Sequence, residues 1–197
     1  MATDSHVLAE DPAVDLALAA AMTAELEDYI VKSDLYRTVI ARTPRGDEKI
    51  TMTGGDLLTR LHRLQGERAR LTPAQQQEFD DVARRAEATI YSLRTRFHTL
   101  LRRELKARVD ALRWFLDDCP GDPKRCRANY PYEIRNRQRI EEILKRGDTE
   151  LDDEEREMLG ALDQRLRMLT HGTDFLWDEN LAAIFPPSPY WYLYAVP

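Results

Sequence analysis

The chain has 197 residues, 43% of them hydrophobic and 32% charged, with a formal net charge of −6 at pH 7. The hydrophobic fraction excludes a wholly disordered chain, and the length allows one hydrophobic core. No stretch approaches the ~18 apolar residues of a membrane-spanning helix, and the N-terminus lacks the basic segment of a secretory signal. These features favour a cytoplasmic protein with no membrane partner.

The first expected elements are a disordered tail over residues 1–10 and a helix. Asp11 followed by Pro12 suits the N-cap and first position of a helix, which we expect to run to about residue 31. β-Branched residues on both sides of a Pro-Gly turn then predict a hairpin with strands near 36–42 and 48–53. Two strands alone are marginal, so the hairpin should lie against helices.

Two consecutive glycines, Gly54 and Gly55, follow the hairpin. They lead into an expected helix over about 57–69, for which Asp56 is the expected cap. Glycines between a strand and a helix also resemble an anion-binding turn. Without a neighbouring Lys or a third Gly, the simpler interpretation is a helix lead-in.

One long helix is the dominant expectation. Thr72 and Gln75 flank Pro73 as a capping box, and after Pro73 the chain runs to Asp118 without another Gly or Pro. A single helix over about 73–118 would be about 69 Å long, against about 42 Å for the diameter of a compact globule of this size. It would need a kink or a partner to cover it. Its seven-residue apolar repeat lapses at Glu104, which favours a bundle helix over a coiled coil.

The last third is expected to hold shorter elements. Residues 119–131 have the Pro and Gly content of a compact loop, and helices are expected over about 132–146 and 152–170, with a short one near 178–184. The fold class is therefore mainly α: a helical bundle built on one long central helix, with a small β-hairpin in the N-terminal third. We divide the chain into a tail (1–10), a helical domain (11–174) and an aromatic C-terminal strap (175–197).

Candidates for chemistry are few. Cys119 and Cys126 are expected to be free thiols in the cytosol; a disulfide closing the loop is the alternative, and a zinc site would need about four ligands. None of the histidines belongs to a Glu-x-x-His motif, and no nucleophile–base pair, phosphate loop or dinucleotide motif is present. The sequence therefore predicts no catalytic residue, no metal, no cofactor and no enzymatic activity.

Basic residues are concentrated in the middle of the chain. Residues 84–146 carry 17 basic and 9 acidic side chains, whereas residues 147–197 carry 3 and 11. The densest group gives candidate anion-binding residues: Lys124, Arg125, Arg127, Arg135 and Arg139. The alternative is that these arginines pair with the acidic helix start at 152–157.

Aromatic residues are concentrated at the C-terminus, where residues 175–194 hold 7 of the chain's 16. Tyr and Trp are typical anchors of protein interfaces, but a strap folded back on the same chain is equally aromatic. The candidate interface residues are Phe97, Trp114, Trp177, Tyr190, Trp191 and Tyr192. We expect a non-enzymatic protein-interaction or scaffold protein that self-associates as a homo-oligomer. The alternative is a nucleic-acid-associated protein that uses the basic segment 124–139.

Overall fold

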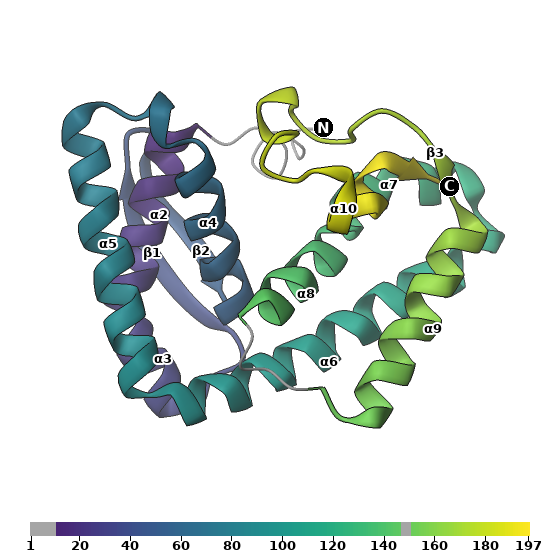
Figure 1. Ribbon diagram of the computed structural model, residues 1–197, viewed down its shortest axis with the longest axis horizontal. Helices are drawn as coiled ribbons and strands as arrows, with labels where there is room; N and C mark the ends of the chain where they lie inside the picture. Colours follow the sequence, from purple (N-terminus) through teal and green to yellow (C-terminus); the bar gives the residue numbers. More distant parts are fainter. Residues whose placement is uncertain (1–10, 147–150) are drawn as a thin grey trace. The chain divides into compact units, whose positions relative to one another are not determined.

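The computed structural model describes residues 11–146 and 151–197. The tail expected over residues 1–10 lies outside these residues, and so does Gly147, the expected end of a helix. The fold is mainly α with a small antiparallel hairpin near the N-terminus, which confirms the predicted class (Figure 1). The chain divides into two compact units between Glu104 and Leu105. We call residues 11–104 the N-terminal unit and the described residues from 105 onward the C-terminal unit.

Helix α2 (Pro12–Ala24) is the central element of the N-terminal unit. It begins as predicted, because the Asp11 carboxylate accepts a hydrogen bond from the Ala13 N–H at 2.8 Å. It packs against strand β1 and helices α4 and α5 (Figure 1). The expected single helix to residue 31 is in fact two, since the chain turns at Glu25 before α3 (Leu26–Lys32).

The predicted hairpin is confirmed. Strand β1 (Arg37–Thr43) pairs antiparallel with β2 (Gly46–Met52). Gly46 has φ +116, a backbone conformation that favours glycine and closes the turn. The buried Ala41 packs with Val14 and Leu18 of α2, so the hairpin is held against a helix as the sequence argument requires.

Helix α4 (Gly54–Gly66) starts earlier than expected, and its N-cap is Thr53 rather than Asp56. The carboxylate of Glu104 accepts hydrogen bonds from the Gly55 N–H at 2.8 Å and from the Thr53 hydroxyl at 2.6 Å. A negative charge is stabilising at the N-terminus of a helix. The Gly54–Gly55 turn therefore holds an anion, and that anion is the chain's own Glu104. A short 3-10 turn, η1 (Arg68–Arg70), follows α4.

Gly54 permits close packing of α4 on α6. A Cβ at this position would lie 2.7 Å from Cδ2 of Leu101 and 3.1 Å from Cε2 of Phe97, closer than side chains tolerate. Phe97 is fully buried in this contact. Its role is therefore in the core of the N-terminal unit, not on an exposed face.

The expected long helix has the predicted extent but is divided in two. Helix α5 (Pro73–Ser92) begins with the predicted capping box at Thr72 and Gln75, and α6 (Arg94–Asp118) follows. Leu93 has φ −114 and ψ 23, and the chain bends there (Figure 1). The bend lets the first turns of α6 enter the core of the N-terminal unit, which a straight 73–118 helix could not do.

The C-terminal unit contains α7 (Pro123–Glu133), α8 (Arg135–Lys145) and α9 (Asp153–Leu169). The prediction of a loop over 119–131 was wrong beyond a short 3-10 turn, η2 (Cys119–Gly121). Asp122 accepts a hydrogen bond from the Arg125 N–H at 3.0 Å and Pro123 fills the first helical position, so α7 begins at once. Helix α9 starts with a second capping box, between Asp152 and Glu155.

The C-terminal segment is a series of short turns rather than an extended strap. These elements are β3 (His171–Gly172), η3 (Glu179–Leu181), α10 (Pro187–Tyr190), η4 (Trp191–Tyr194) and β4 (Ala195–Val196). Strand β3 pairs with β4, which joins the two ends of the segment. The short helix expected near 178–184 is the 3-10 turn η3.

Candidate interaction surface

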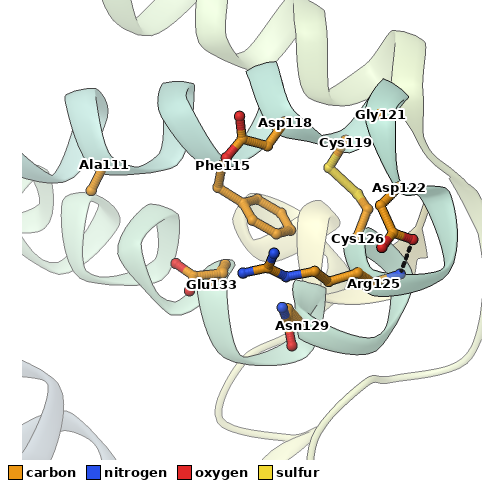
Figure 2. A pocket seen from close by; sticks show the side chains of 10 residues that line it. All are labelled: Ala111, Phe115, Asp118, Cys119, Gly121, Asp122, Arg125, Cys126, Asn129 and Glu133. Carbon is orange, nitrogen blue, oxygen red and sulfur yellow. Dashed lines mark hydrogen bonds between the residues drawn. A yellow bond between two sulfur atoms is a disulfide. The ribbon is translucent and has the colours of Figure 1, made fainter.

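A cavity of about 400 Å³ lies beside the start of α7 in the C-terminal unit (Figure 2). Helix α6 contributes Ala111, Phe115 and Asp118 to its lining, and the rest comes from η2, α7 and the turn between them. Most of the lining side chains are exposed. The cavity is therefore a hollow in the surface, unlike the deep, mostly buried pockets that enclose small ligands.

One wall of the cavity is a disulfide between Cys119 and Cys126, whose Cα atoms lie 5.0 Å apart. The expectation of free thiols is therefore wrong, and the alternative of a loop-closing disulfide is correct. The start of α7 brings the two cysteines together. The sequence analysis expected a loop, not a helix, at this position. Disulfides persist in oxidising compartments, so this bond does not favour the cytoplasmic location, which stays a prediction.

Charges of both signs line the cavity. Arg125, Asn129 and Glu133 are spaced by four residues on α7 and therefore share one face. Figure 2 shows the Arg125 side chain extended along the hollow toward Glu133, with the Phe115 ring beside it. Within the part of the chain that the structure describes, neither side chain forms an ion pair. The hollow thus offers a guanidinium, an amide and a carboxyl group to a partner.

Arg125 and Glu133 each lie at the end of α7 where the helix dipole disfavours their charge. Arg125 is in the first turn, where positive charge is disfavoured, and Glu133 is the last residue, where negative charge is disfavoured. Burial raises the pKa of the half-buried Glu133 carboxyl, and the nearby Arg135 only partly opposes this shift. Residues kept against their local preference are typical of functional surfaces.

Trp114 projects next to this hollow and is 65% exposed. It lies three residues after Ala111 and four before Asp118, so it shares with these two cavity residues one face of α6. Of the six candidate interface residues, Trp114 is the one that presents most of its surface to solvent.

The other candidate interface residues pack inside the chain. Phe97, Trp177, Tyr190 and Tyr192 are buried, and Trp191 is half-buried with the Arg167 guanidinium 3.8 Å from its ring centre. These contacts make the C-terminal segment a strap on its own unit, which was one of the two arrangements left open by the sequence.

Hydrogen bonds fix this strap to α7 and α8. The Trp177 indole donates to the Pro131 carbonyl at 2.8 Å, and the Tyr130 hydroxyl donates to the Tyr192 carbonyl at 3.2 Å. The Tyr190 hydroxyl donates to Glu142 and accepts from Lys145. Burial, with the Glu142 charge, raises the pKa of Tyr190 far above its usual value.

The candidate anion-binding residues do not form one cluster. Lys124 and Arg127 are exposed on α7, and Arg125 lines the cavity. The Arg135 guanidinium lies 3.4 Å from the ring centre of Tyr132, and Arg139 donates to the Arg135 carbonyl.

Arg137, which belongs to the same dense group in the sequence but is not among the candidate anion-binding residues, is the one that pairs with the acidic helix. Its guanidinium binds Asp163 of α9 at 2.7 Å and Glu141 at 3.0 Å. The partner lies beyond the acidic stretch 152–157 that the alternative named. The signal for Arg137 was weak, because burial distinguishes it from its neighbours and the sequence does not show burial.

A second hollow, of about 420 Å³, lies between α6 and α9. Its floor is apolar, with Val109, Met158 and Leu162. Its arginines are held by acidic neighbours, Arg113 by Asp110 at 3.0 Å and Arg165 by Asp117. It therefore offers fewer free polar groups than the cavity at α7.

Metal clusters and membrane-spanning helices are absent from the described residues. Among residues 11–146 and 151–197, no group of three or more His, Cys, Asp or Glu side chains could hold a metal ion. In the same residues, no helix is both long and apolar enough to cross a membrane.

No protein-family model, curated protein or solved structure matches this chain. The function is therefore inferred from the cavity at α7 and the residues around it.

Proposed function

We propose that this chain is a non-enzymatic interaction protein that self-associates through the face of α6 that carries Trp114. The observation that supports this proposal is a large exposed indole beside a hollow on the same face. Trp is the side chain most enriched among residues that dominate binding energy. The open form of the hollow suits a protein surface better than a small substrate.

A second copy of the chain is the partner that this face fits best. Most soluble oligomers are homo-oligomers, and their commonest interface pairs one patch with itself across a twofold axis. A projecting side chain next to a hollow is self-complementary. Around an axis beside Ala111, each Trp114 would enter the partner's hollow and contact Phe115. Arg125 and Glu133 at the rim provide opposite charges for pairing between copies.

Self-association is tested by sedimentation equilibrium of the wild type and of Trp114→Ala. Loss of a central Trp contact costs about 2 kcal/mol or more, and the substitution removes two such contacts from a twofold dimer, so we expect the dissociation constant of the dimer to rise roughly 1,000-fold. The control is Tyr91→Ala, which removes an aromatic side chain that is 73% exposed in the N-terminal unit. It should leave the dimer unchanged. A wild-type chain that stays monomeric at high micromolar concentration contradicts the proposal, and so does a dimer that Trp114→Ala does not weaken.

A further inference from the structure

The bend between α5 and α6 carries the strongest concentration of exposed positive charge in the N-terminal unit. That unit as a whole is balanced, with fifteen basic and fifteen acidic side chains over residues 11–104. Residues 84–103 hold six arginines and one acidic residue, Glu87, and all six arginines are exposed. We call these residues the basic corner: Arg84, Arg85, Arg94, Arg96, Arg102 and Arg103, together with Tyr91.

Much of this charge is not neutralised within the chain. Arg94 and Arg96 form no ion pair with any residue that the structure describes. The Arg103 guanidinium binds the uncharged carbonyl of Ser33 at 3.1 Å. Arg84 does pair with Asp81 at 2.9 Å, but both side chains are largely exposed, and such a pair contributes little. The corner therefore presents a positive potential to a negatively charged partner.

An exposed aromatic ring lies within this positive surface. Tyr91, in the last turn of α5, is 73% exposed, and the Arg94 guanidinium lies 5.6 Å from its ring centre. The bend at Leu93 brings the end of α5 and the first turn of α6 together here. An exposed ring with arginines on the same surface is the combination that binds single strands, because a base stacks on the exposed part of the ring while arginines contact phosphates.

We infer that the basic corner binds single-stranded nucleic acid, with Tyr91 stacking on an unpaired base. This surface differs from the segment 124–139 that the sequence argument nominated. In that segment the Arg137 guanidinium forms ion pairs, and the Arg135 guanidinium packs on the Tyr132 ring. Fewer positive charges of the segment 124–139 are therefore exposed to solvent. The site is separate from the Trp114 face, so either proposal can fail without the other.

The test is fluorescence anisotropy of a labelled oligo(dT) of about 20 nucleotides, titrated with the full chain at about 50 and 200 mM salt. Tyr91→Ala should weaken binding at least about fivefold, and Tyr91→Phe, which keeps the ring, should not. Arg94→Glu with Arg96→Glu should weaken binding and lower the salt slope by about 1.4, since each phosphate contact on a single strand contributes about 0.7. A duplex of the same sequence should bind more weakly, because its bases cannot stack on the ring.

The matched control is Lys124→Glu with Arg127→Glu on α7, two exposed residues outside the cavity lining, which makes the same change in net charge in the other unit. Unchanged binding by this variant supports the basic corner. Three results would overturn the inference: no binding of oligo(dT) at the lower salt, equal loss of binding in the control variant, or no effect of Tyr91→Ala. Displacement of the oligonucleotide by polyglutamate at equal charge concentration would also overturn it, because it would indicate an acidic protein as the partner.

Discussion

Two carboxylates, one in each unit, lie at opposite ends of a helix. In the N-terminal unit Glu104 is 1% exposed and accepts hydrogen bonds from Gly55 and Thr53 at the start of α4. In the C-terminal unit Glu133 is half-buried at the end of α7, and it has no hydrogen bond to a described residue. The first position suits a negative charge and the second does not. The difference teaches that donors and helix polarity, more than burial, decide whether a carboxylate stabilises this fold.

The largest effect is expected when the partnered carboxylate is removed. Glu104→Ala leaves the Gly55 N–H buried without its acceptor and removes one of the two acceptors of the Thr53 hydroxyl, the other being the Asp56 carboxylate at 3.1 Å. We expect the free energy of unfolding to fall by about 3 kcal/mol. Urea unfolding followed by far-UV circular dichroism measures this change.

The control for this variant is Glu78→Ala, an exposed glutamate on α5 in the same unit. It should change the free energy of unfolding by less than about 0.5 kcal/mol. Equal effects of the two substitutions would show that Glu104 has no special role at the start of α4.

An intermediate effect is expected in the strap of the C-terminal unit, where two buried tyrosines differ in their partners. The Tyr190 hydroxyl bonds Glu142 and Lys145, whereas the Tyr192 hydroxyl has no hydrogen-bond partner among the described residues. Tyr190→Phe should therefore cost about 2 kcal/mol. Tyr192→Phe removes a buried hydroxyl that makes no bond, so it should be neutral or slightly stabilising.

Tryptophan fluorescence during urea unfolding monitors this pair, because Trp114, Trp177 and Trp191 all belong to the C-terminal unit. Each variant is the control for the other, since both delete one oxygen atom from a fully buried ring. A larger loss of stability in Tyr192→Phe than in Tyr190→Phe would contradict the assignment of the Tyr190 hydroxyl as the point that fixes the strap.

The sequence predicted the elements whose signals are local. The predicted caps at Asp11 and Thr72 mark helix starts through side-chain hydrogen bonds to neighbouring backbone, and both form. The hairpin was recognisable from its alternation and its turn. These features depend on a few adjacent residues, so a single sequence is enough to find them.

Features that depend on distant residues were not predictable. Leu93 is an ordinary helix former, and the sequence does not show that the chain bends there or that Phe97 and Leu101 pack on Gly54, more than forty residues earlier in the chain. The disulfide depends on the position of α7. For the candidate surface, the sequence named Trp114 and Arg125 but could not separate them from residues that turned out to be buried. The spacing of Arg125, Asn129 and Glu133 would have indicated a shared face if α7 had been recognised as a helix.

The smallest change in the free energy of unfolding is expected for Glu133→Gln, which alters the second of the two carboxylates. Burial raises the pKa of Glu133 above its ordinary value of 4.5, so the folded state disfavours the ionised form. The penalty is present at pH 7 and disappears as the pH falls through the raised pKa toward 4.5. Glu133→Gln should therefore increase the free energy of unfolding at pH 7 by a few tenths of a kcal/mol to about 1 kcal/mol. Near pH 4 it should change nothing.

Urea midpoints at the two pH values, recorded at a concentration where the chain is monomeric, measure this difference. Glu157→Gln on the exposed face of α9 is the matched control and should have no effect at either pH. If Glu133→Gln instead destabilises the chain at pH 7, the carboxylate has a stabilising partner in the folded monomer. Glu133 would then have a structural role like that of Glu104. It would no longer support the proposal that charges at the rim of the hollow pair between two copies of the chain.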